Sequence, residues 1–175
     1  IVLNDLERYQ KIELENGMKI LLVQTKVFEY ISYKFVVDYE PFKEEENIGA
    51  SRILAQLLGA DTNYKNRIYK NMVSDEDAAD SLFIFLSDLI LRPDFEQKTL
   101  SAIKKNYISQ LSVLNSPDSL IYKYSRNFNF SKNHPYSEEY TKTTINNINN
   151  GVLYNTYNSI FTPENAYLVI VGDID

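Results

Sequence analysis

An Asn-Gly dipeptide at residues 16 and 17 lies between two stretches with strand patterns. Before it, Ile12 and Leu14 alternate with polar residues, and after it residues 19–24 form a nearly continuous apolar run. Asn-Gly between two such stretches is a strong signal for the turn of a hairpin. The sequence therefore predicts a hairpin of residues 10–14 and 19–24, whose second strand is buried on both faces.

Residues 30–39 predict a third strand, because apolar and polar side chains alternate along them. Three strands within the first forty residues begin a largely antiparallel sheet. The polar residues 61–65 predict a loop, residues 66–73 a short strand, and the apolar run 166–171 a buried strand.

Apolar residues in the stretch 49–58 recur with the spacing of a helix that has one buried face. Arg52, Ala55 and Gln56 share another face of this helix, because residues three and four apart are neighbours. Further helical patterns cover residues 78–90, with Ser74 as the expected N-cap, and then residues 95–113, 119–129 and two helices within 144–160. The order of elements predicts an α+β fold with a largely antiparallel sheet and helices packed mainly on one face.

The composition excludes several classes of function. A net charge of -6 with no visible basic patch argues against nucleic-acid binding. Without cysteines, the chain has no disulfide, thiolate zinc site or cysteine nucleophile. With His134 as its one histidine, the chain lacks the two or three His ligands of a zinc hydrolase. No apolar stretch reaches the length of a membrane span.

Three polar features each have a structural and a functional interpretation. The acidic stretch 42–47 is expected to be a solvated loop before a helix, although Glu44, Glu45 and Glu46 are also candidate cation ligands. His134 lies in a loop beside a proline and is expected to be structural rather than a base or a lone ligand. Asp173 and Asp175 are expected to be a solvated strand end.

Four phrases in the chain resemble motifs of the insulinase/pitrilysin-like zinc metallopeptidases, which include the mitochondrial processing peptidase. They are LENGMKILLV at 14–23, LSDLILRPDF at 86–95, NHPY at 133–136 and FTPENAYLVIVGD at 161–173. Their order and rough spacing match the family over nearly the whole chain. The resemblance implies a metallopeptidase half-barrel, with residues 1–175 as one domain in the N-terminal half of a longer protein. It is closest to bacterial envelope members, so a location in the bacterial cell envelope or periplasm is expected.

The family's chemistry uses an inverted zinc motif, H-x-x-E-H, on the helix that follows the first three strands. The resemblance places Arg52, Ala55 and Gln56 at these three positions, and Gln110 at or near a further Glu ligand on a later helix. Arginine repels a metal cation, alanine has no acid–base group and glutamine is a poor zinc ligand. We therefore expect no catalytic residues, no zinc and no peptidase activity in this chain.

The same resemblance implies a partner role. A non-catalytic subunit or domain would help to form a peptide-binding chamber with an active zinc peptidase, supplied by another subunit or by a second domain of the same protein. A stand-alone peptide-binding or scaffolding module is an alternative. A third, less favoured alternative is an active metallopeptidase whose site comes from another chain or domain. The least favoured is an enzyme of another class, in which Arg52 and Gln56 bind a carboxylate.

Overall fold

The computed structural model describes residues 9–26, 30–63, 67–75, 80–81, 84, 87–88, 92–111 and 117–173. The chain divides into two compact units. The sheet unit comprises Ile1–Asp38, Arg67–Asp94 and Ile160–Asp175, and the helical unit comprises Tyr39–Asn66 and Phe95–Ser159. Each unit is built from segments that are distant in sequence.

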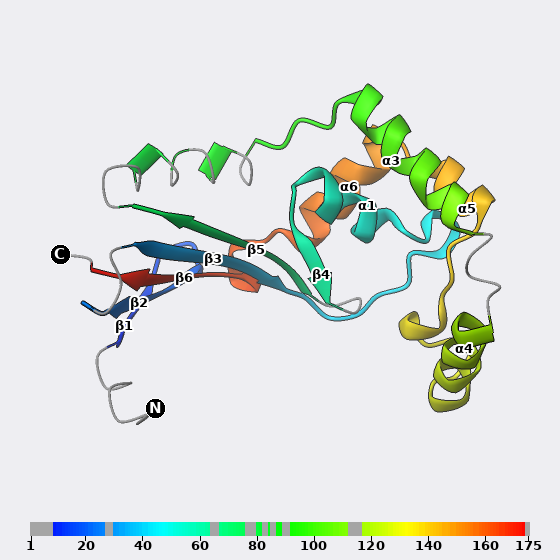
Figure 1. Cartoon of the computed structure of the whole chain (residues 1–175), viewed down its shortest axis with the longest axis horizontal. Helices are drawn as coiled ribbons and strands as arrows, with labels where there is room; N and C mark the ends of the chain where they lie inside the picture. The colour runs from blue at the N-terminus through cyan, green and yellow to red at the C-terminus, as the bar shows by residue number, and fades with distance from the viewer. Residues whose placement is uncertain are drawn as a thin grey trace. The chain divides into compact units, whose positions relative to one another are not determined.

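Five strands of the sheet unit lie side by side (Figure 1). They are β1 (Tyr9–Glu13), β2 (Lys19–Gln24), β3 (Ile31–Asp38), β5 (Arg67–Ser74) and β6 (Ala166–Gly172). The strand order is β1-β2-β6-β3-β5-β4, where β4 (Asp61–Asn63) is a short edge strand. The β2–β6 pair is parallel, whereas the β1–β2, β3–β6 and β3–β5 pairs are antiparallel. The predicted α+β fold with a largely antiparallel sheet is therefore confirmed.

The predicted hairpin is present in β1 and β2, which pair with Ile12 opposite Ile20. Gly17 has a φ of 88°, and the backbone N–H of Met18 donates to Asn16 Oδ1 at 3.1 Å. Asn16 thus closes the turn through its side chain, while Gly17 supplies the positive φ.

The expected burial of β2 on both faces is wrong. Its four central residues are half-buried and its two ends are exposed. β2 lies beside the edge strand β1, all five residues of which are exposed, so both strands lie at the less buried end of the sheet. The core of the sheet unit lies instead along β3, where Tyr33, Phe35 and Val37 are buried.

The helical unit contains α1 (Ala50–Leu57), α3 (Gln97–Gln110), α4 (Pro117–Asn129), α5 (Lys142–Asn147) and most of α6 (Asn150–Ile160). Helices α1, α3, α5 and α6 gather around one core (Figure 1). Its fully buried side chains include Ile53, Leu54, Phe95, Leu100, Ile145, Ile148 and Leu153. Short 3-10 turns precede α1 (Glu45–Asn47), α5 (Pro135–Ser137) and β6 (Pro163–Asn165).

Three local predictions require correction. Residues 61–63 form β4 rather than a loop, because strand pairing overrides their polar composition. Ser74 is the last residue of β5, opposite Ile31, and is not a helix cap. The helix predicted from Phe95 begins at Gln97. Phe95 itself is fully buried, and the centroid of its ring lies 4.7 Å from that of Tyr154. The helix predicted over 78–90 lies mostly outside the described residues.

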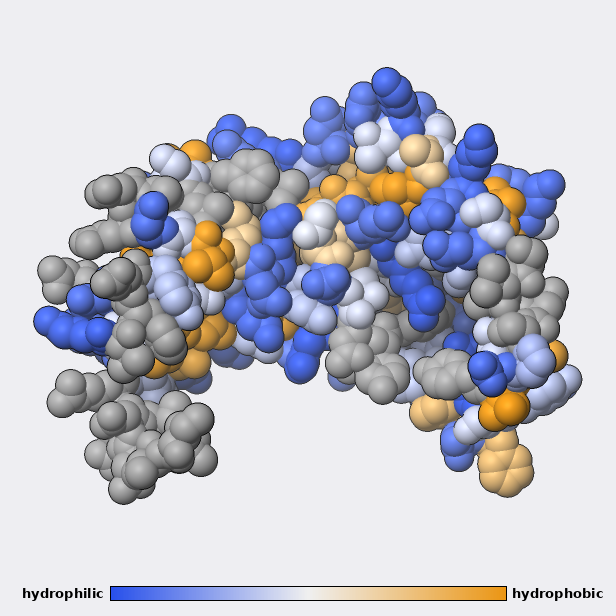
Figure 2. Space-filling model, viewed as in Figure 1, coloured by the Kyte–Doolittle hydropathy of each residue, from blue (hydrophilic) through white to orange (hydrophobic). Residues whose placement is uncertain are grey.

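Helix α4 carries apolar side chains on its surface. Ile121 and Tyr124 are each 68% exposed and Phe128 is 91% exposed. Hydrophobic groups are visible at the surface in this region (Figure 2). Among the described helices, none combines the length and apolar character needed to cross a membrane.

Candidate functional site

The first turn of α1 is held by a carboxylate from the acidic stretch that precedes it. Glu44 is 8% exposed, and its carboxylate accepts hydrogen bonds from the backbone N–H groups of Gly49 at 2.9 Å and Ser51 at 2.7 Å. Anionic groups stabilise a helix N-terminus by accepting from its unpaired amides. The expectation of a fully solvated acidic loop is therefore wrong at Glu44.

The rest of this stretch is also tied to the helical unit. The Glu138 carboxylate accepts from the backbone N–H groups of Glu44 and Glu45, both at 3.1 Å. The side-chain amide of Asn147 donates to the Glu46 carbonyl at 2.8 Å. Residues about a hundred positions apart in sequence thus place Glu44 beneath α1, and these contacts leave Glu45 and Glu46 exposed.

The four positions that the resemblance assigned to a zinc site lie on α1 and α3. Ala55 is fully buried, Arg52 is half-buried, and Gln56 and Gln110 are exposed. The amide Nε2 of Gln110 donates to Asn106 Oδ1 at 3.3 Å, one turn earlier on α3. The part of the chain that the structure describes holds no group of three or more His, Cys, Asp or Glu residues arranged to bind a metal.

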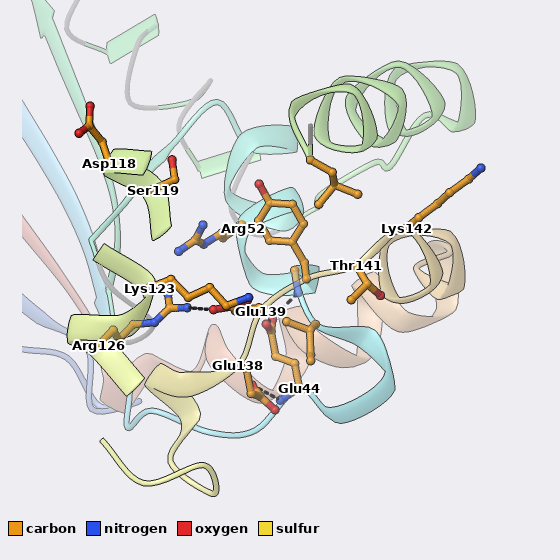
Figure 3. A pocket seen from close by; sticks show the side chains of 14 residues that line it. Glu44, Arg52, Asp118, Ser119, Lys123, Arg126, Glu138, Glu139, Thr141 and Lys142 are labelled. Carbon is orange, nitrogen blue, oxygen red and sulfur yellow. Dashed lines mark hydrogen bonds and ion pairs between the residues drawn. The ribbon is translucent and has the colours of Figure 1, made fainter. Parts of the chain in front are cut away.

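Arg52 lines a cavity of about 650 Å³ in the helical unit. Figure 3 shows the cavity between α1, α4 and the segment Glu138–Thr141 that leads into α5. The apolar part of the cavity wall is formed by Ile48, Leu111 and Tyr140. The side formed by α4 is lined by Ser119 and Lys123. Only tertiary packing brings these segments together, since they come from three separate parts of the chain.

Most charged groups around the cavity already have partners. The Glu139 carboxylate pairs with Lys123 Nζ at 2.6 Å and with an Arg126 guanidinium nitrogen at 2.9 Å. Glu44 and Glu138 accept from backbone amides as described above. Arg52, in contrast, makes no hydrogen bond or ion pair with any residue in the described ranges.

The charge of Arg52 acts to lower the pKa of two phenols, those of the buried Tyr39 and the half-buried Tyr107. Burial raises the pKa of Tyr39 to about 12, while a hydrogen bond with Ser51 and the charge of Arg52 act in the opposite direction. Burial also raises the pKa of Tyr107, again against the effect of Arg52. Both phenols stay neutral near pH 7, so neither supplies a counter-charge to the guanidinium.

His134 has a local structural role. Its Nδ1 accepts from the backbone N–H of Tyr136 at 3.1 Å, and its ring lies 4.7 Å from that of Phe130 and 5.0 Å from that of Tyr136, centroid to centroid. These contacts favour the structural interpretation over a ligand or base. Asp173 is exposed at the end of β6, and Asp175 lies outside the described residues.

The sequence contained partial signs of this site. Acidic residues ahead of a helix N-terminus suit the helix dipole, so the stretch 42–47 was a sign of such a contact, but the sequence did not single out Glu44 among its three glutamates. Lys123 and Arg126 are three residues apart and share a helix face. Nothing in the sequence marked Glu139 as their partner, because ion pairs between separate elements depend on packing.

No protein-family model matches the chain, and no curated protein matches it. Several solved structures, in contrast, superpose on the chain over most of its length. The periplasmic protease PqqL from Escherichia coli superposes with a TM-score of 0.79 at 12% identity, covering 100% of this chain and 23% of that one. A peptidase M16 inactive domain from Pseudomonas fluorescens gives 0.78 at 16% identity, covering 95% of this chain and 47% of that one.

The ferredoxin protease FusC, as a variant in complex with Arabidopsis ferredoxin, gives a TM-score of 0.81 at 17% identity, covering 95% of this chain and 22% of that one. At such identities the likeness establishes the fold alone. The chain has an M16-peptidase, insulinase/pitrilysin-like fold, and it spans less than half the length of each of these three structures.

Proposed function

We propose that this chain is a non-catalytic M16-like domain, which helps to form a peptide-binding chamber with an active zinc peptidase. The observation that carries the proposal is Ala55. It is fully buried on α1, at the position where the resemblance implies the general base, and its methyl group cannot take a proton from water. An alanine at this position therefore argues against hydrolysis by this chain.

The neighbouring side chains do not suit a zinc ion. Arg52 is a permanent cation, so it would repel the metal at close range. Gln56 and Gln110 offer only neutral amide oxygens, which compete poorly with the imidazole and carboxylate ligands that zinc prefers. The likeness to a domain labelled inactive agrees with this proposal, although that likeness extends to the fold alone.

We further propose that residues 1–175 form one domain of a longer assembly. The active zinc peptidase would be a second domain of the same protein or a partner subunit. The structural neighbours support this proposal, since each of the three is more than twice as long as the part that this chain matches. A stand-alone peptide-binding module is the second candidate, and the cavity beside Arg52 favours it equally.

Metal content and peptide cleavage test the proposal directly. The full chain is saturated with zinc, dialysed and analysed for bound metal, beside an M16 peptidase that has an intact H-x-x-E-H motif. We expect stoichiometric zinc and cleavage of unstructured peptides only in the control peptidase. Stoichiometric zinc that survives dialysis of this chain, together with cleavage that a chelator abolishes, would contradict a non-catalytic role.

Co-purification separates the partner role from the stand-alone role. The tagged chain is purified from its native host, and associated proteins are examined for an H-x-x-E-H motif. A partner whose peptidase activity needs both chains supports the chamber. A chain that stays monomeric at high concentration, with no such partner, supports the stand-alone module.

A further inference from the structure

We propose that the cavity beside α1 binds the carboxylate of a peptide, with Arg52 as its anchor. The proposal deepens the proposed function, because it names the chemistry by which this chain would contact a peptide. It concerns the helical unit alone, since all the residues that line the cavity belong to that unit.

The first observation is the state of Arg52. Its side chain is half-buried and lines the cavity, and it has no hydrogen-bond or ion-pair partner among the described residues. Partial burial of a cation without a partner is unfavourable, so an incoming anion gains more here than at an exposed arginine. A planar guanidinium also matches a carboxylate through two parallel N–H···O bonds.

The second observation is that the surrounding carboxylates do not fill this role. Glu44 and Glu138 accept from backbone amides, and Glu139 pairs with two cations. Asp118 is exposed in the first turn of α4, and Figure 3 shows its carboxylate directed away from Arg52. Lys142 also lines the cavity, but it is exposed, and Figure 3 shows its ammonium group directed away from Arg52. The Arg52 guanidinium is therefore the half-buried cation that a ligand in this cavity meets without a competing partner among the described residues.

The third observation concerns size and wall chemistry. A volume of about 650 Å³ lies within the range of roughly 300–1,000 Å³ that is usual for ligand pockets. Ile48, Leu111 and Tyr140 offer apolar surface beside the charge. Such a cavity accommodates an acidic group together with the apolar part of one or two residues, which suits a peptide better than a bare ion.

The charge balance also favours a carboxylate over a phosphate. The charged side chains that line the cavity are four carboxylates (Glu44, Asp118, Glu138 and Glu139) and four cations (Arg52, Lys123, Arg126 and Lys142), so the lining has no excess of positive charge to offset a dianion. The guanidinium of Arg52, which has no ion-pair partner among the described residues, neutralises one negative charge. A peptide carboxylate carries one charge near pH 7, whereas a phosphate monoester carries between one and two.

Three N-acetylated peptides of one sequence test the proposal on the full chain, by isothermal titration calorimetry without zinc or a partner protein. The first has a free C-terminal carboxylate and no acidic side chain. The second has a C-terminal amide and one glutamate, and the third has a C-terminal amide and no acidic group. We expect at least one carboxylate peptide to bind about tenfold or more tightly than the uncharged peptide, as for hydrogen bonds to charged groups.

The variants identify the anchor. Arg52→Met is expected to abolish the preference for carboxylate peptides, and Arg52→Lys to keep part of it, because the charge remains without the bidentate geometry. Lys98→Met is the matched control, because Lys98 is an exposed cation of α3 that does not line the cavity. Circular dichroism confirms that each variant is folded. Should Arg52→Met not fold, Arg52→Lys and the weakening of wild-type binding by salt provide the test.

Comparison of the first two peptides identifies the source of the carboxylate as a chain end or an acidic side chain, and either result supports the site. Equal binding of all three peptides, unchanged binding by Arg52→Met, or failure of every peptide to bind would overturn it. Competition by inorganic phosphate at equal concentration would also overturn it. None of these results bears on zinc content or cleavage. The carboxylate site and the non-catalytic role can therefore be disproved independently of each other.

Discussion

Glu44 connects the acidic stretch to the helix that carries Arg52. Its carboxylate accepts from two amides of the first turn of α1, and Glu138 in turn holds the backbone around Glu44. A buried carboxylate of this kind is stable only while its hydrogen bonds are intact. The position of Arg52 in the cavity therefore depends on a residue outside α1.

Glu44→Ala is expected to lower the free energy of unfolding by about 1–3 kcal/mol, because it leaves the N–H groups of Gly49 and Ser51 without this acceptor. Glu46→Ala is the matched control, since Glu46 is exposed, and it should change stability by less than about 0.5 kcal/mol. Urea denaturation at neutral pH measures both. Equal losses in the two variants would show that Glu44 has no special role.

The raised pKa of Tyr39 predicts that the folded chain becomes less stable at alkaline pH. Its pKa is raised from 10.0 to about 12 in the folded chain, so the folded state keeps a proton that the unfolded state releases. The contribution of Tyr39 to stability is therefore complete below about pH 10 and is lost as the pH rises towards about 12. A shift of this size corresponds to at most about 2–3 kcal/mol.

Tyr39→Phe removes the ionisable group and should flatten the decline of stability above about pH 10. The variant also loses the hydrogen bond with Ser51, so a constant difference at neutral pH is expected, and the change of slope is the informative quantity. Urea denaturation across the alkaline range measures that slope. A slope identical to that of the wild type would contradict the assignment.

At the scale of elements, α1 lies close to α5. Gly49 has a φ of 107°, and a Cβ at this position would lie 2.8 Å from Cδ1 of Ile145 and 3.5 Å from Cβ of Tyr140. Lys104 joins α3 to the end of α5, because its Nζ donates to the carbonyls of Asn146 at 2.9 Å and Ile148 at 2.6 Å. The positive φ at the start of α1 thus favours glycine, and a Cβ at this position would require the terminal methyl group of Ile145 to move.

Gly49→Ala is expected to cost about 2–4 kcal/mol, from the unfavourable positive φ together with the clash against Ile145. Ile145→Val removes Cδ1 and should itself cost about 0.5–1.5 kcal/mol. In the double variant, the steric part of the Gly49→Ala cost should disappear, which leaves a favourable coupling of about 1 kcal/mol. Thermal or urea unfolding of the four proteins measures the coupling, and additive costs would disprove this contact.

At the scale of the whole molecule, the proposed function implies that the four positions which the resemblance assigns to zinc lie around one point. We expect the combined changes Arg52→His, Ala55→Glu, Gln56→His and Gln110→Glu to create zinc binding. Zinc at a hundredfold excess over its dissociation constant stabilises a folded protein by about 2.7 kcal/mol. Saturating zinc should therefore raise the melting temperature of this variant and leave that of the wild type unchanged.

A variant that keeps Arg52 but carries the other three changes is the control, because the guanidinium should prevent zinc binding. Differential scanning calorimetry with and without zinc measures all three proteins. Equal zinc stabilisation of the control would show that Arg52 does not occupy a ligand position. No stabilisation of the complete variant would show that the four positions are not arranged around one point.

The sequence by itself determined the local elements with periodic side chains or specific turn residues. The Asn16-Gly17 hairpin, the alternating strand β3 and the amphipathic helix α1 lie within a residue or two of their predicted bounds. These features depend on backbone preferences and on burial of one face, which neighbouring residues specify. The same local patterns sufficed to predict the α+β fold.

Only the tertiary structure decided which residues meet. The sheet places β6, from the end of the chain, between β2 and β3, and it makes the polar residues 61–63 a strand. Packing also brings Glu44 beneath α1 and α4 opposite Arg52, where segments distant in sequence enclose a cavity. Periodicity reports how a residue faces its neighbours along one element, whereas a cavity depends on the packing of several elements. Arg52 was visible in the sequence as an unusual residue on a helix face, whereas its lack of a partner among the described residues became apparent only from the packing of those elements.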